Sequence, residues 1–303
     1  YYQQAHILAF LCQCVVTHHP GSATSNMSSP IAQDNCSCDK ITSRQFVHYS
    51  EELSSLRHAA YEALSHISQH CNDATKITLA EHSGLLESLR DTLILKNQTP
   101  PTTPQSSKQH LTYILPSHYQ AATILSHIST VPHNHKRIVD CHALAEALAM
   151  VAMASMDEET TYCVCRTFTN LTFESVEMRD RLFRTAGVVD ALLLVMMTRR
   201  ENTHCHSGNC GGGERRLMAC SALANLTISY DNIVPLFEYP GFLDAILSVM
   251  REDMQEKDNY YDQKIRSKLC GILWSLAAET KNQTSMIERG DILPILKHLI
   301  QNT

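Results

Sequence analysis

Cysteine and histidine are the residue types in this sequence whose spacing could support chemistry, because thiolate and imidazole groups bind zinc. Near the start, Cys12 and Cys14 precede two adjacent histidines, and a second pair, Cys36 and Cys38, follows. One residue separates the cysteines of each pair, which on a helix directs the two sulfurs to different sides. We therefore keep a zinc-binding regulatory module at Cys12, Cys14, Cys36 and Cys38 only as an alternative function.

A second group of metal-ligating residue types, His204-Cys205-His206 with Cys210, lies in a glycine-rich stretch and is equally irregular in spacing. The sequence holds no glycine-rich phosphate loop, nucleophile elbow or pair of carboxylates in a catalytic arrangement. The acidic run Asp157-Glu158-Glu159 suits the start of a helix, where negative charge is stabilising. We therefore expect no enzymatic activity and no cofactor.

The elements that must position any functional residue are helices in a repeated pattern. In the stretch from Arg215 to Met250, apolar residues recur three and four apart in two runs. A short apolar segment lies between the runs, and Pro240-Gly241 precedes the second run. This pattern predicts a repeat of three helices, and related patterns occur upstream and downstream.

Alignment of five copies places a polar residue at the fourth position of the same short helical segment. The aligned segments are 63–67, 124–128, 167–171, 222–226 and 272–276, and their fourth residues are His66, His127, Asn170, Asn225 and Ser275. An asparagine amide offers hydrogen-bond donors and an acceptor, so such residues one repeat apart could hold the backbone of a bound peptide. Alternatively, Asn170 and Asn225 only cap neighbouring loops.

A glycine follows the aligned segment in four copies, at Gly84, Gly187, Gly241 and Gly290, whereas the second copy lacks it. We expect a positive φ at these glycines, in a sharp turn between two helices.

Three segments without periodicity separate complete copies, and all three fall at the same phase of the repeat. They lie near residues 97–110, 201–214 and 251–263. We therefore divide the chain into residues 1–45, a truncated repeat end followed by a flexible insertion, and residues 46–303, a repeat array of about five copies whose insertions project from one edge. Because the chain starts at Tyr1, we expect it to be a fragment cut within a domain.

These repeats resemble the armadillo family, whose copies read Ala-Leu-x-Asn-Leu, a loop, an apolar segment, a glycine and a leucine-rich helix. The segments ALANLT, FTNLTF and ILWSLA are also similar to those of catenin-like and adenomatous-polyposis-coli-like scaffolds. The resemblance implies an all-α fold, a right-handed α-solenoid of three-helix repeats. It further implies a protein-interaction scaffold that binds extended or helical partner segments along a concave groove, lined by the helix that carries Asn170 and Asn225.

The same architecture is shared by importin-α-like nuclear transport adaptors, which we keep as an alternative function. Those adaptors carry a tryptophan one turn before the asparagine, a place taken here by Glu62, Thr123, Arg166, Ser221 and Gly271. We include Arg166, Ser221 and Trp274 among the candidate groove residues. The spacing of Trp274 favours a core position, although an exposed tryptophan would be a binding hot spot.

Composition limits the partners and the compartment. The 303 residues are 44% hydrophobic and carry a net charge of -6, so the basic footprint of a nucleic-acid-binding protein is missing. The apolar run 5–16 is shorter than the roughly 20 residues that cross a bilayer. Twelve cysteines in a chain with an ample core indicate free thiols in a reducing compartment. We expect protein partners, no nucleic acid, no membrane span and a cytoplasmic or nuclear location.

Overall fold

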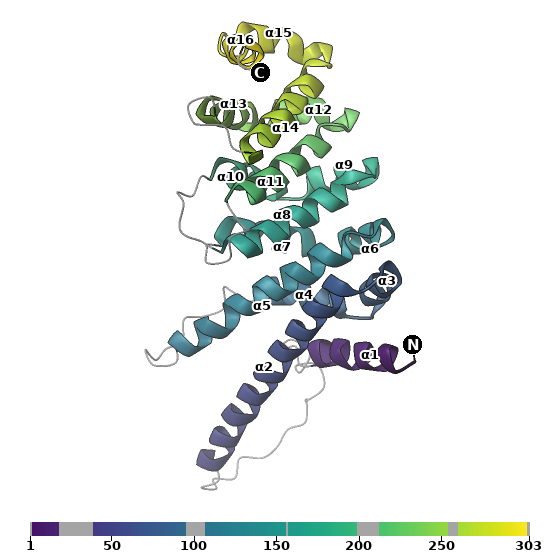
Figure 1. Ribbon diagram of the computed structural model, residues 1–303. Coiled ribbons are helices and arrows are strands. Elements are labelled where there is room, and N and C mark those ends of the chain that lie inside the picture. The colour runs from purple at the N-terminus through teal and green to yellow at the C-terminus, as the bar shows by residue number, and fades with distance from the viewer. Residues whose placement is uncertain are drawn as a thin grey trace, which may run out of the picture. The chain divides into compact units, whose positions relative to one another are not determined.

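All regular elements that the structure describes are helices, so the expected all-α class is confirmed (Figure 1). The computed structural model describes residues 2–17, 39–94, 107–155, 157–198, 212–253 and 260–301. Its helices are α1 (Tyr2–Thr17), α2 (Asp39–His70), α3 (Asp73–Glu81), α4 (Leu85–Ile94), α5 (Ser107–Ile128), the 3₁₀ helix η3 (Pro132–Asn134), α6 (His135–Asp140), α7 (Leu144–Ala154), α8 (Glu158–Phe173), α9 (Val176–Arg184), α10 (Val188–Met197), α11 (Gly212–Leu226), α12 (Tyr230–Phe237), α13 (Phe242–Asp253), α14 (Tyr260–Ala277), α15 (Thr280–Glu288) and α16 (Ile292–Gln301).

The chain forms two compact units, Tyr1–Ile128 and Ser129–Thr303. In the first unit, α1 packs against α2 and α4, and α5 packs against α2, α3 and α4. Val16 of α1 lies against the turn before α4, since a Cβ atom added to Gly84 would be 3.0 Å from Val16 Cγ1. The buried Tyr61 hydroxyl joins α2 to α4 by donating to Ser88 O at 3.0 Å.

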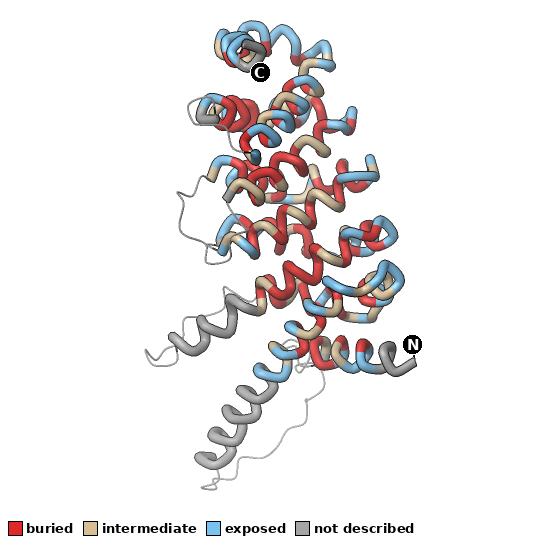
Figure 2. Tube along the Cα trace, in the orientation of Figure 1, coloured by how far each residue is buried: buried red, intermediate tan, exposed pale blue. Residues whose placement is uncertain are grey.

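The second unit contains three successive helix triplets, α8–α9–α10, α11–α12–α13 and α14–α15–α16 (Figure 1). Corresponding helices of consecutive triplets pack against each other, α8 against α11 and α11 against α14. The same holds for the second helices α9, α12 and α15, and for the third helices α10, α13 and α16. Buried residues concentrate within α8, α10, α11 and α13, so the core runs through the unit from triplet to triplet (Figure 2).

The turn before the third helix uses a left-handed backbone conformation, as the glycines predict. Gly84, Gly187 and Gly241 have φ of +81°, +79° and +76°. At the turn that lacks a glycine, Ala143 adopts the same region with φ of 57°. Because a Cβ atom disfavours this region, Ala143 maintains the turn at a cost in free energy.

The expectation of a positive φ at Gly290 is wrong. Gly290 is not among the positive-φ residues of the described chain. The segment from Glu279, which precedes α15, to Gly290 is one residue shorter than the corresponding segment from Ser229 to Gly241. The final turn is therefore built with a shorter connection than the others.

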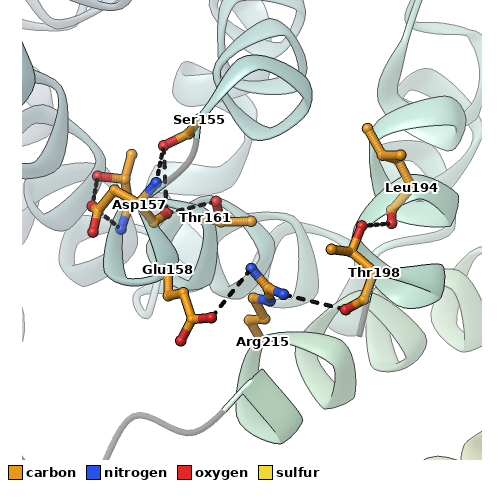
Figure 3. A network of polar contacts seen from close by, with 8 residues as sticks. Ser155, Asp157, Glu158, Thr161, Leu194, Thr198 and Arg215 are labelled. Carbon is orange, nitrogen blue, oxygen red and sulfur yellow. Dashed lines mark hydrogen bonds and ion pairs between the residues drawn. The ribbon is translucent and has the colours of Figure 1, made fainter. Parts of the chain in front are cut away.

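The acidic run at the start of α8 caps that helix, as predicted. The Asp157 carboxylate accepts from Thr160 N at 2.8 Å, and Glu158 lies in the first turn. From α11, Arg215 approaches Glu158 at 3.9 Å and donates to Thr198 O at 3.2 Å (Figure 3). This buried arginine thus joins the start of α8 to the end of α10.

Several helices extend into segments expected to be irregular. Helix α2 begins at Asp39, before the predicted start near Phe46, because no proline or glycine interrupts 39–70. Three helices likewise begin inside the expected insertions: α5 at Ser107 within 97–110, α11 at Gly212 within 201–214 and α14 at Tyr260 within 251–263. Residues 18–38, 95–106, 199–211 and 254–259 lie outside the described part of the chain.

Several described helices are apolar but short, among them α7 and α10. None of them alone combines the length and the apolarity needed to cross a bilayer. Helices α12 and α13 pass such a test only as a pair that is bent by 80°.

Candidate partner-binding surface

The aligned polar residues of the second unit lie on its three neighbouring first helices. Asn170 is on α8, Asn225 on α11 and Ser275 on α14, and all three side chains are half-buried. The matching residues of the first unit are His66, exposed on α2, and His127, half-buried on α5. The predicted row is therefore present as one residue per helix, within each unit considered separately.

A repeated hydrogen bond links these residues to the neighbouring repeat. In each case the partner is a hydroxyl two residues beyond the aligned polar residue of the previous repeat. His127 Nδ1 bonds Ser68 Oγ at 3.0 Å, Asn170 Nδ2 donates to Ser129 Oγ at 3.0 Å, and Asn225 Nδ2 donates to Thr172 Oγ1 at 3.1 Å.

Two of these hydroxyls also donate hydrogen bonds within their own helix. Ser68 Oγ donates to Ser65 O at 2.8 Å, and Thr172 Oγ1 donates to Phe168 O at 2.8 Å. The aligned polar position thus has a structural role that joins adjacent repeats.

The hydrogen bonds of Asn225 show which of its side-chain groups could still bind a partner protein. Its Nδ2 group also donates to Thr169 O at 3.3 Å, so both amide hydrogens are directed at α8. In the described chain, no donor contacts its Oδ1 atom. The Asn225 amide nitrogen, expected to be available to a bound peptide, therefore bonds within the protein, and the side chain retains its Oδ1 acceptor at a half-buried position.

Two apolar residues that the sequence argument did not single out lie one turn beyond the asparagines. Phe173 and Ile228 each follow their asparagine by three residues, and their side chains are 65% and 60% exposed. Val176 and Tyr230, at the starts of α9 and α12, are exposed as well. We call these four residues the corner patch. Its sequence signal is the apolar residue that follows each asparagine by three positions.

A second set of unforeseen polar residues satisfies the carbonyl groups at the ends of the first helices. Each side chain comes from the beginning of the following second helix and donates back to the last turn. The bonds run from His135 Nε2 to Ser129 O (2.8 Å), from Arg179 Nε to Thr172 O (2.7 Å), from Asn232 Nδ2 to Leu226 O (3.3 Å) and from Asn282 Nδ2 to Leu276 O (3.0 Å).

The remaining candidate residues differ in accessibility. Arg166 is half-buried on α8, whereas Ser221 on α11 is buried and presents little surface. Trp274 on α14 is 77% exposed, so the core position that its spacing favoured is wrong. It lies near the end of the first helix of the last described triplet.

The candidate zinc ligands are only partly within the described chain. Cys12 and Cys14 are both buried on α1. Burial raises the pKa of the Cys12 thiol to about 12, which disfavours the thiolate that zinc requires. Cys36, Cys38 and the 204–210 cluster lie outside the described residues, and the described ones contain no group of three potential metal ligands.

Comparison with known proteins gives a likeness of fold. No protein-family model matches the chain, and no curated protein matches it. It is similar to an engineered protein crystallised by the Northeast Structural Genomics Consortium, with a TM-score of 0.57 and 17% identity over 97% of this chain and 90% of that chain. A second engineered protein from this consortium gives a TM-score of 0.42 and 18% identity over 73% and 92% of the two chains. At such identity, the first likeness shows a shared helical fold alone.

Proposed function

We propose that the chain is an armadillo-type α-solenoid that acts as a protein-interaction scaffold, in the cytoplasm or the nucleus, and binds partner segments across α8 and α11. The observation that carries this proposal is the recurrence, at the ends of two adjoining helices, of a half-buried asparagine followed three residues later by an exposed apolar residue, Asn170 with Phe173 and Asn225 with Ile228. Exposed apolar side chains that gather in this way are typical of interaction sites.

The two parts of this pattern supply different contacts. Asn225 Oδ1 can accept a hydrogen bond from a backbone N–H group of an extended segment, which sets its register without selecting its sequence. Phe173 and Ile228 offer apolar area to the side chains of that segment and supply most of the affinity. The corner patch therefore favours partners with regularly spaced apolar residues.

Arg166 argues against a nuclear transport adaptor. This half-buried cation occupies the place that import adaptors give to a tryptophan. A positive charge one turn before Asn170 would repel the Lys/Arg-rich segments that such adaptors bind. A general scaffold is therefore the better supported function.

The test is selection of short displayed peptides on the full chain, followed by measurement of their Kd. The double variant Phe173→Ser/Ile228→Ser should weaken the selected peptides by at least about tenfold, because each truncated anchor typically costs over 1 kcal/mol. Leu194→Ser removes an exposed apolar side chain from α10 and should leave Kd unchanged. Equal Kd values for the double variant and the unaltered chain would refute binding at the corner patch.

A further inference from the structure

Two neighbouring helices of the second unit expose apolar residues at the same positions of their repeats. Met150 and Met153 lie on α7, and Leu194 and Met197 lie on α10; their side chains are 42%, 39%, 42% and 44% exposed. Met150 and Leu194 each follow the left-handed turn residue before their helix by seven positions, and Met153 and Met197 follow it by ten. We call these four residues the methionine strip.

A contact between α7 and α10 joins the two halves of the methionine strip. The two helices pack against each other, and Met153 reaches the turn before α10, since a Cβ atom added to Gly187 would be 3.5 Å from Met153 Cε. Met150 lies one turn before Met153 on the same side of α7, and Leu194 and Met197 share a side of α10 in the same way. The strip therefore continues from α7 onto α10 through Met153.

The third helix of the next triplet shows that packing does not require apolar residues at these positions. The residues of α13 that follow Gly241 by seven and ten positions are Ser248 and Arg251. Arg251 forms an ion pair with Asp291 at the following turn, so the position that Met153 holds on α7 is polar on α13. The exposed apolar residues are thus particular to α7 and α10, as expected of an interaction site.

The charge in line with the methionine strip is negative. Glu146, half-buried, lies one turn before Met150, and Asp190, exposed, lies one turn before Leu194. Helices α7 and α10 contain no lysine, arginine or histidine. Asp190 Oδ1 accepts from the Tyr239 hydroxyl at 2.8 Å, and neither carboxylate forms an ion pair with another described residue. The two carboxylates therefore complement a positively charged ligand.

We propose that the methionine strip binds a basic amphipathic helix of another protein. The apolar side of that helix packs on the strip, whose methionines adapt to varied shapes because they are unbranched and polarisable. Lysines or arginines at its edge pair with Glu146 and Asp190. A helix is favoured over an extended segment because residues three apart on two packed helices form ridges against which a third helix packs. This binding is independent of the corner patch and does not require the proposed function.

Methionine methyl resonances report directly on this surface. The full chain is labelled at its methionine methyl groups, and Met150, Met153 and Met197 are assigned from single substitutions by leucine. The probe is a synthetic amphipathic helix of about 18 residues, with leucines on one side and lysines flanking them, and glutamates replace the lysines in the control. We expect the basic probe to shift these three resonances and the acidic control to leave them unchanged. Met178 on α9 and Met286 on α15 are buried and serve as internal references.

Two double variants alter the surface and keep reporters in place. Met150→Ser/Leu194→Ser should weaken the basic probe by about tenfold or more, because it removes two apolar contacts. Met153 remains as a reporter in this variant. Glu146→Gln/Asp190→Asn should weaken the probe by about fivefold and reduce the salt dependence of its binding. Circular dichroism of each variant checks that the helices are retained.

The variant Phe173→Ser/Ile228→Ser separates this site from the corner patch and should bind the basic probe normally. Loss of binding in this variant, with normal binding in Met150→Ser/Leu194→Ser, would place the probe on the corner patch and overturn the proposal. Equal binding of the basic and acidic probes would refute the charge argument. Shifts of the Met153 resonance with protein concentration, in the absence of any probe, would assign the methionine strip to a second copy of the chain.

Discussion

Asn225 Nδ2 donates to Thr172 Oγ1 across the contact between α11 and α8, at 3.1 Å. The bond repeats the relationship of Asn170 to Ser129 and of His127 to Ser68, each spanning one repeat. A residue that could bind a partner therefore also holds two repeats together. Substitution of Asn225 alone would confuse these roles, because a loss of binding could follow from a loss of packing.

A double-mutant cycle measures the structural role of this bond. Asn225→Ala and Thr172→Val should each lower the free energy of unfolding by about 1 kcal/mol, as expected for the loss of a half-buried hydrogen bond. The double variant should lose less than the sum, with a coupling of about 0.5–1 kcal/mol. Chemical denaturation followed by circular dichroism gives the values, and strict additivity would show that the bond does not form.

Ala143 provides a second prediction, since it has a φ of 57° where three corresponding turns use glycine. Ala143→Gly should raise the free energy of unfolding by about 0.5–1 kcal/mol, because glycine enters the left-handed region without a steric penalty. Gly187→Ala is the matched reverse change. It places a Cβ atom no closer than 3.5 Å to Met153, so its expected loss of about 1 kcal/mol reflects φ rather than a clash.

Thermal unfolding of the two variants and of the unaltered chain tests whether the left-handed conformation of Ala143 lowers stability. The midpoint should rise for Ala143→Gly and fall for Gly187→Ala. A fall in both would mean that Ala143 contributes packing that outweighs the strain at its turn.

His135 makes the stability of the second unit depend on pH. Burial lowers the pKa of its imidazole below the ordinary 6.5, although the bond to Ser129 O and the nearby Glu174 oppose this shift. Below pH 6.5 the unfolded chain therefore binds a proton more readily than the folded chain does. The stabilisation by neutral His135 is present above pH 6.5 and is lost progressively as pH falls through the lowered pKa.

His135→Gln tests this dependence, because the glutamine amide retains a donor for Ser129 O but does not titrate. Denaturation curves collected from pH 8 down to pH 5 should show a shallower decline for the variant than for the unaltered chain. Parallel declines would assign the acid sensitivity to other groups.

The helical repeats and the positions of their turns follow from apolar spacing and glycine placement, as Gly187 and Gly241 show. Ala143 was missed because alanine gives no local sign of a left-handed turn when the surrounding packing imposes one. Gly290 was misjudged because a glycine permits a positive φ but does not require it.

The candidate surface was predictable only in part. The asparagine row was visible in the alignment, yet its hydroxyl acceptors belong to the preceding repeat; Thr172 lies 53 residues before Asn225 in the sequence. The exposure of Trp274 could not be predicted from its spacing, because that spacing places it on a packing side of α14. The exposure of that side depends on whether another helix packs against it, which the spacing within α14 does not encode.

Photo-crosslinking tests the central claim, partner binding across α8 and α11, most directly. A benzophenone amino acid is introduced singly at the positions of Phe173, Ile228 and, as control, Leu194, and each chain is irradiated with a selected peptide. Binding at the corner patch predicts covalent capture from positions 173 and 228 and none from 194. Capture from 194 alone, or from none of the three sites by a peptide that still binds, would contradict it.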